Sequence, residues 1–247
     1  PLIDLLFSSE GDVLDRTEFT QPALFAVEYA LSEVWRSWGL EPSVVMGHSI
    51  GEYVAATVAG VLELPDALQL VSARGRLMQS LPPGGSMAAV FAPEALVLDA
   101  IDRSGLPVSI AAENGPVQVV VSGPSGAVDD LCARLGNKGV KSTRLAVSHA
   151  FHSALVEPVM AEMEREAART RFSAPSIRLI SNVTGRSISA AEIIRPSYWR
   201  DHMRLPVRFG TGLRTLAETG PDICIEIGPH PALLSFASAA FDGQTPP

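Results

Sequence analysis

A serine placed for nucleophilic chemistry lies in the stretch Gly47-His48-Ser49-Ile50-Gly51. An apolar run precedes this stretch and an alanine-rich segment follows it, which predicts a strand, a tight turn and a helix. The two glycines permit the close approach of strand and helix that exposes the hydroxyl. Backbone N–H groups at the start of the helix point toward any oxyanion that forms there. We therefore expect Ser49 to be a nucleophile and the Ile50 N–H to be an oxyanion donor.

A serine hydroxyl needs a neighbouring base, and the five histidines of the chain are the candidates. His48 adjoins the serine, so the sharp turn should direct its ring away into packing or a hydrogen bond. His149 and His152 occur together in "SHAFHS", where two expected parts of the fold meet, a common place for an active-site cleft. Either of these two can be the base. His202 and His230 are interpreted as structural.

Arg74 is a cation within an apolar helical pattern that includes Leu70, Val71, Leu77 and Met78. Burial of an unpaired guanidinium is costly, so Arg74 should have an anionic partner. That partner is either an internal carboxylate or the carboxylate of a substrate, held by the fork of the guanidinium. A side chain that reaches out to solvent is the third possibility.

The elements that must position these residues indicate an α/β fold. Residues 86–148 read as strand, helix, strand, strand, helix and strand, which is the order of a ferredoxin-like fold. We expect this small subdomain to be inserted into a large, α/β-hydrolase-like subdomain with a parallel sheet, made by residues 1–85 and 149–247. The large subdomain is predicted to contain helices at 21–39, from about 51, at 64–81 and at 153–170, and strands at 44–46, 177–181 and 223–228.

The bulk composition fits a globular protein, with 47% hydrophobic and 19% charged residues among 247. The net charge of -8 argues against a nucleic-acid surface, and no apolar run is long enough for a membrane span. Cys132 and Cys224 lie far apart in the sequence, and no second Cys or His lies near either at the spacing of metal ligands. We therefore expect neither a metal site nor a disulfide, and we expect a cytoplasmic location. The start at Pro1 and the proline-rich end suggest a piece of a longer polypeptide.

Seven ordered stretches between about Thr17 and Leu234 resemble the acyltransferase domain of type I modular polyketide synthases. More distantly, the chain is similar to the malonyl-CoA:acyl carrier protein transacylases of fatty-acid synthesis. The stretches are "TQPALFAVEYAL", "GHSIGEYVAA", "RGRLMQ", "NGPVQVVVSG", "HAFHS", "YWRDHMRLPVRF" and "EIGPHPALL".

The resemblance assigns roles to individual residues. It implies that Ser49 is acylated and that His152, rather than His149, is its base. It also implies that a main-chain carbonyl, at about Arg208, orients this histidine in place of an aspartate. Arg74 matches the arginine that pairs with a malonyl carboxylate. The implied substrate-binding residues are Arg74, Gln21, Ile50, Phe151, Asn114 and Met78.

The reaction implied by the resemblance has two halves and needs neither a metal nor another cofactor. Malonyl-CoA acylates the serine, and the phosphopantetheine thiol of an acyl carrier protein then takes the malonyl group. The carrier protein is thus the expected partner, together with a ketosynthase and other domains of the same polypeptide. Nucleic acid and membrane are not expected partners.

Two residues suggest malonyl as the acyl group. In the family, "HAFH" accompanies malonyl and "YASH" accompanies methylmalonyl, and a branched aliphatic residue after the serine is also of the malonyl type. This chain has Phe151 and Ile50 at these places. The bulky ring of Phe151 would narrow the space open to an α-methyl group, although one methyl group separates two substrates by only about 1–3 kcal/mol.

One departure from the family and two rival functions are apparent. The family begins with a strand and a "GQG" loop that completes the oxyanion hole, and no such loop precedes Thr17. One rival is a serine hydrolase, such as a thioesterase or a patatin-like lipase with Asp242-Gly243 as its aspartate pair. The other rival is an acyltransferase-like scaffold without catalysis.

Overall fold

The predicted serine turn follows a strand of a small parallel sheet. In the computed structural model, which describes residues 2–7 and 13–241, β1 (Val44–Met46) pairs in parallel with β6 (Arg178–Ile180). Val44 lies opposite Arg178 and Met46 lies opposite Ile180, so both strands end at the same edge of the sheet. Residues that follow these two ends are therefore neighbours in space.

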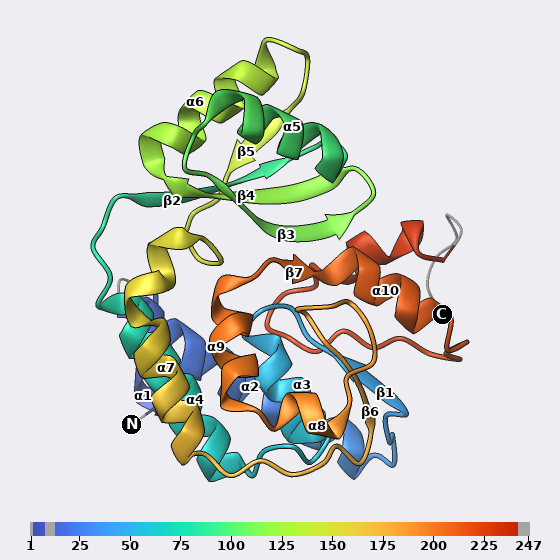
Figure 1. Cartoon of the computed structure of the whole chain (residues 1–247). Coiled ribbons are helices and arrows are strands. Elements are labelled where there is room, and N and C mark those ends of the chain that lie inside the picture. The colour runs from blue at the N-terminus through green and yellow to red at the C-terminus, as the bar shows by residue number, and fades with distance from the viewer. Residues whose placement is uncertain (1, 8–12, 242–247) are drawn as a thin grey trace.

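Helices surround this sheet and form the larger part of the fold (Figure 1). The core between them contains the fully buried rings of Phe25, Tyr53 and Trp199. Ala55 and Ala56 line the short central helix and let its neighbours approach closely. The elements of this part are α1 (Leu2–Leu6), α2 (Thr17–Ser37), α3 (Gly51–Val58), α4 (Leu64–Gln79), η2 (Ala154–Val156), α7 (Glu157–Arg169), α8 (Ala190–Ile193), α9 (Pro196–Arg204), α10 (Phe209–Ala217) and η3 (Leu234–Ala239).

Helix α2 begins four residues before the predicted start. Its buried side chains include Gln21, Phe25 and Ser32. Leu31 and Val34, which recur at a three-residue spacing typical of the apolar face of a helix, are 36% and 41% exposed. The helix packs against α3 and α4, and these neighbours select the buried face more strongly than the apolar spacing does.

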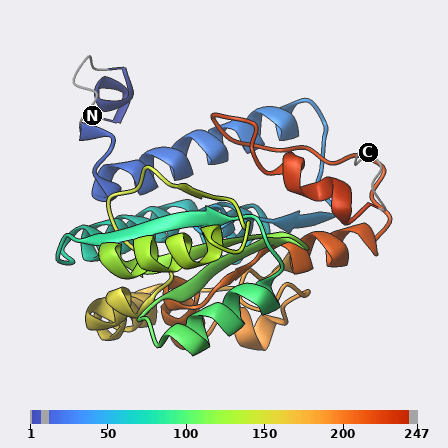
Figure 2. The same cartoon turned by 90° about the horizontal axis from the view of Figure 1, so that it is seen from above.

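The smaller part has the predicted ferredoxin-like arrangement, and its sheet has the strand order β5-β2-β4-β3. Helices α5 and α6 cover one face of this sheet, as the view from above shows (Figure 2). Valines and leucines from both layers make a separate core. The elements are β2 (Gly85–Val90), α5 (Glu94–Ser104), β3 (Ser109–Gly115), β4 (Gln118–Pro124), α6 (Ser125–Gly136) and β5 (Ser142–Arg144).

A strand from the larger part extends the sheet of the smaller part. β7 (Val207–Arg208) pairs in parallel with β3 and becomes the fifth strand, beneath β3 in Figure 1. The Glu113 carboxylate on β3 accepts hydrogen bonds from the Thr211 N–H and hydroxyl, both at 2.9 Å. Arg208 forms an ion pair with Glu94 of α5 at 2.6 Å. These contacts join the two parts beside the serine turn.

The prediction of a last buried strand at 223–228 is wrong. The structure gives this segment no strand, and Ile223 and Ile225 are 65% and 41% exposed. A strand requires a hydrogen-bonded neighbour, and no strand within 13–241 pairs with this segment. The Asp242-Gly243 pair of the rival hydrolase lies outside the described residues. Within 2–7 and 13–241, no helix has the length and apolar character needed to cross a bilayer.

Candidate active site

Ser49 occupies a strained turn between β1 and α3. Its φ angle is +50°, in the left-handed region that non-glycine residues rarely adopt. At Gly47, a Cβ atom would lie 2.1 Å from the carbonyl carbon of Gly51, so only glycine fits there. At Gly51, the nearest atom to an added Cβ is Glu28 Oε2 at 3.6 Å, an ordinary contact. The close approach thus depends on the first glycine of the pair and not on the second.

The backbone of the turn leaves the predicted oxyanion donor available. The N–H groups of Gly51 to Tyr53 donate to carbonyls three residues earlier, at 3.0 Å each. The Ser49 N–H donates to Asn182 Oδ1 at 2.6 Å. The Ile50 N–H takes part in none of these bonds, and it can therefore donate to an oxyanion on an acyl group attached to Ser49.

Of the two candidate bases, His152 contacts the serine. His152 Nε2 lies 2.8 Å from Ser49 Oγ, and Nδ1 donates to the carbonyl oxygen of Leu205 at 2.9 Å. Because a carbonyl oxygen only accepts, Nδ1 carries the proton and Nε2 is free to take one. Burial lowers the pKa of His152 well below its usual value, and the positive charge of Arg74 adds to this effect. A neutral, proton-accepting imidazole therefore faces Ser49 at neutral pH.

The carbonyl that orients His152 belongs to Leu205 and not to Arg208. Leu205 follows the last residue of α9 and has an extended conformation, with ψ of 157°, so its carbonyl points away from the helix and can accept a hydrogen bond. Arg208 lies three residues later in β7, where its N–H donates to the Asn182 carbonyl at 2.7 Å. Its side chain pairs with Glu94. The strand pairing of Arg208 thus directs it to the small part of the fold and away from the histidine.

Arg74 reaches the serine from α4. Its Nη2 donates to Ser49 Oγ at 3.2 Å, and its Nη1 donates to Gln21 Oε1. The residue is 2% exposed, which excludes a side chain that reaches solvent, and burial lowers its pKa. The Arg74 Nε has no hydrogen-bond partner among the described residues. Both hydrogen-bonded partners are uncharged, so an anionic group in front of Ser49 would gain a strong interaction with this guanidinium.

Gln21 and Met78 belong to the same group of contacts, whereas Asn114 lies one step away. Gln21 Nε2 donates to Met78 Sδ at 3.2 Å. Asn114 Oδ1 lies 2.9 Å from His48 Nε2, and the His48 ring also packs against Phe209. His48 is thus turned away from the serine into a hydrogen bond and packing, as predicted.

Phe151 and the other three histidines lie in different surroundings. Phe151 packs against the core of the larger part and against a second cluster to which both parts contribute, with Met87 from β2 and Phe209 from α10 among its members. His149 Nδ1 lies 2.9 Å from the Ser148 hydroxyl, and His202 is buried among aromatic rings. His230 is exposed.

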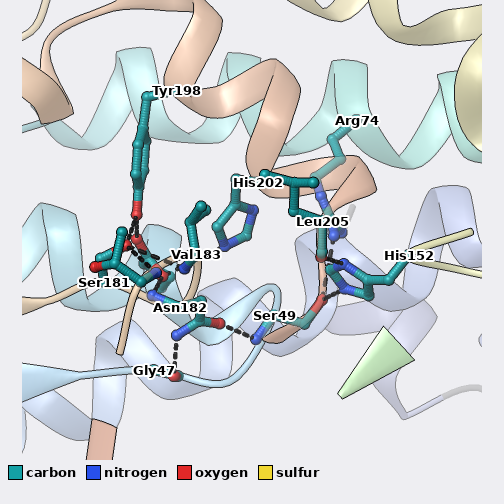
Figure 3. A network of polar contacts seen from close by, with 12 residues as sticks. Gly47, Ser49, Arg74, His152, Ser181, Asn182, Val183, Tyr198, His202 and Leu205 are labelled. Carbon is teal, nitrogen blue, oxygen red and sulfur yellow. Dashed lines mark hydrogen bonds and ion pairs between the residues drawn. The ribbon is translucent and has the colours of Figure 1, made fainter. Parts of the chain in front are cut away.

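Two residues of the site were not foreseen from the sequence. Asn182 lies two residues after the end of β6, and its side chain bonds to both Gly47 and Ser49 (Figure 3). Glu52, in the first turn of α3, accepts the Asn182 N–H at 2.6 Å. A signal was present for Asn182, because polar residues that follow neighbouring parallel strands meet at one edge of the sheet. The sequence alone did not indicate that these two strands are neighbours.

The arrangement suits acyl transfer through a serine. Ser49 Oγ lies between a proton acceptor and a guanidinium, and a backbone N–H is available for an oxyanion. Within residues 2–7 and 13–241, no group of three or more His, Cys, Asp or Glu side chains is arranged to hold a metal ion.

Comparisons with known proteins agree with this chemistry. The family model described as the acyl transferase domain matches residues 1–246. Polyketide synthase GfsB of Streptomyces halstedii is 46% identical over 98% of this chain, which spans 4% of that protein. The acyltransferase domain from the second module of the salinomycin polyketide synthase has a TM-score of 0.94 and 44% identity, over 99% of this chain and 57% of that one. The malonyl CoA-acyl carrier protein transacylase of Coxiella burnetii has a TM-score of 0.93 and 31% identity, over 99% of this chain and 79% of that one.

Proposed function

This chain belongs to the acyl transferase domain family, and from this premise we propose that it moves malonyl groups from malonyl-CoA to an acyl carrier protein. The acceptor is the thiol of the phosphopantetheine arm, and Ser49 carries the malonyl group between the two thioesters. The proposal places the chain in a polyketide synthase and in the cytoplasm. The proposed reaction uses no metal and no further cofactor, because His152 takes part in every proton transfer.

The observation that supports this proposal best is the position of Ser49 Oγ between His152 Nε2 and Arg74 Nη2, at 2.8 and 3.2 Å. A general base at this distance makes the hydroxyl a nucleophile. A buried guanidinium on the other side favours an acyl group that carries its own carboxylate. Malonyl has this carboxylate and acetyl does not.

In the first half-reaction, Ser49 Oγ attacks the thioester carbonyl of malonyl-CoA while His152 Nε2 takes the hydroxyl proton. The Ile50 N–H donates to the resulting oxyanion. The oxyanion collapses, the C–S bond breaks, and the CoA thiolate takes the proton from His152. In the second half-reaction, the carrier thiol gives its proton to His152 and attacks the carbonyl of the seryl ester. The resulting oxyanion collapses, the C–O bond to Ser49 breaks, and Ser49 Oγ takes the proton back from His152.

The preference for malonyl over methylmalonyl rests on Phe151 and Ile50. The Phe151 ring, next to His152 in the chain, packs between the two parts of the fold. Because Phe151 adjoins His152, we take its ring to border the space beside Ser49, where a serine would leave more room. Methylmalonyl is the alternative substrate within the same reaction.

Carrier protein and flanking domains are proposed as partners from the context of the relatives. The chain spans 4% of the polyketide synthase GfsB and 11% of the phenolphthiocerol synthesis polyketide synthase Pks15/1 of Mycobacterium marinum. Because these relatives are many times longer than this chain, their polypeptides have room for a carrier protein and a ketosynthase as well.

The decisive experiment is the intact mass of the protein after exposure to an equimolar mixture of acetyl-CoA, malonyl-CoA and methylmalonyl-CoA. We expect a malonyl adduct that is absent from Ser49→Ala and that moves to an added acyl carrier protein. Release of free malonate without a malonyl-carrier product would support the rival hydrolase. The absence of any adduct would support the non-catalytic scaffold.

A further inference from the structure

The conformation of Ser49 needs an external restraint. A non-glycine residue at φ of +50° costs about 1–2 kcal/mol relative to ordinary backbone, and it persists only where its surroundings hold it. Within the turn, the Ser49 carbonyl accepts the Glu52 N–H at 3.0 Å, whereas the Ser49 N–H donates to a residue outside the turn. That outside residue therefore contributes to holding the conformation.

Asn182 supplies such a restraint across the turn. Its Oδ1 accepts the Ser49 N–H and its Nδ2 donates to the Gly47 carbonyl, both at 2.6 Å. One carboxamide thus binds a donor and an acceptor that lie on either side of His48 (Figure 3). Since its two ends are a donor and an acceptor, the carboxamide fits in a single orientation.

Glu52 holds Asn182 in turn. The Asn182 N–H donates to Glu52 Oε2 at 2.6 Å, and the Tyr198 hydroxyl donates to Glu52 Oε1. Tyr198 also lies 2.7 Å from the Ser181 hydroxyl. Glu52 is fully buried and Asn182 is 3% exposed, so water does not compete for these bonds.

We propose that Asn182 is a positioning residue whose carboxamide, held by Glu52, fixes the serine turn in the conformation that presents Ser49 to His152. The Asn182 carboxamide occupies the Ser49 N–H, so the Ile50 N–H is left as the donor for an oxyanion. Without the carboxamide the turn can relax toward negative φ, and Ser49 Oγ then moves away from His152 Nε2. This inference rests on the proposed role of Ser49 as the nucleophile.

A fluorophosphonate probe tests the inference in the full-length protein, because it reports the reactivity of Ser49 without a need for an acyl-CoA or a carrier protein. A displacement of about 1 Å in a catalytic group can cost about 10²-fold in rate, and we expect a loss of this order in Asn182→Ala. The KM for malonyl-CoA should change little, because the carboxamide bonds to the turn and not to Arg74. We expect Asn182→Asp, which keeps the acceptor and loses the donor, to be slow as well.

Two kinds of control separate positioning from simple stability. Val128 is 1% exposed in the core of the smaller part, and Val128→Ala should lower the melting temperature without slowing the probe. Glu52→Gln can still accept the Asn182 N–H while its amide donates to Tyr198, so this variant should react within about threefold of the wild-type rate, whereas Glu52→Ala should be slow.

The outcomes are distinguishable. Unchanged probe rates in Asn182→Ala overturn the inference, as does an equal loss in Val128→Ala at a matched melting temperature. If Asn182→Ala does not fold, Asn182→Asp decides in the same way. If wild-type Ser49 reacts with the probe but not with malonyl-CoA, the proposed function fails while the probe rates still decide the role of Asn182.

Discussion

Ser49 and His152, whose side chains meet with Oγ 2.8 Å from Nε2, share an unusual backbone conformation. Their φ angles are +50° and +54°, and within the described chain they are the two non-glycine residues with positive φ. Strained backbone of this kind persists where the surrounding structure holds it, and it gathers at functional sites. Here the backbone of both partners of one hydrogen bond is strained, so the surrounding structure must hold the two residues in contact.

The strain at Ser49 should reverse the usual order of alanine and glycine in stability. Because glycine adopts positive φ without cost, Ser49→Gly should have a free energy of unfolding about 1 kcal/mol higher than Ser49→Ala. Urea denaturation measures the difference. At Ala161, an exposed position in α7, Ala161→Gly should instead lower the free energy of unfolding by about 1 kcal/mol. If Ser49→Ala were instead more stable than Ser49→Gly, the turn would not be strained in solution.

The depressed pKa of His152 predicts how activity depends on pH. The base works only when neutral, so kcat/KM should stay high as pH falls through 6.5 and decline only at a distinctly lower pH. Burial is the main cause of the shift and the charge of Arg74 the second. A pH profile of fluorophosphonate labelling in Arg74→Gln should therefore have its acid limb at higher pH than the wild-type profile. Identical limbs would show that Arg74 does not influence the base.

The sequence predicted the residues that local patterns identify and missed those that depend on long-range pairing. Ser49 lies in a strand-turn-helix motif whose parts are all within a few residues. Asn182 is 133 positions away, and its place beside the turn depends on the parallel pairing of β1 with β6. The carbonyl that orients His152 was misplaced by three residues, because its position depends on the end of α9, directly before Leu205, and on the pairing of Arg208 in β7.

The unequal surroundings of Gly47 and Gly51 predict unequal tolerance to substitution. A Cβ at Gly47 would overlap the start of α3, so Gly47→Ala should destabilise the protein by about 3 kcal/mol or prevent folding. Gly51 begins α3 and has room for a methyl group, and alanine is the better helix former. Gly51→Ala should thus have an unchanged or higher melting temperature. Equal losses in both variants would contradict the close approach at Gly47.

Arg74 predicts a difference between charged and uncharged acyl groups. A hydrogen-bonded ionic contact is worth about 1.5–3 kcal/mol, so Arg74→Ala should slow malonyl loading by about 10- to 150-fold more than acetyl loading. Intact mass after exposure to each acyl-CoA measures the two rates. Arg76 lies on the same helix but is exposed, and Arg76→Ala should leave both rates unchanged. Equal losses for malonyl and acetyl in Arg74→Ala would assign Arg74 to structure alone.

Phe151 predicts the choice between malonyl and methylmalonyl. Phe151→Ser removes a ring from the seam between the two parts of the fold and should raise the methylmalonyl-to-malonyl ratio of kcat/KM by about 10-fold or more, since one methyl group is worth about 1–3 kcal/mol. Competition between the two acyl-CoAs in one reaction measures this ratio, which does not depend on how much of the variant is folded. Phe151→Leu retains most of the bulk and should change the ratio less. If Phe151→Ser and the wild type had the same ratio, the Phe151 ring would not determine the selectivity, and Ile50 would be the remaining candidate for that role.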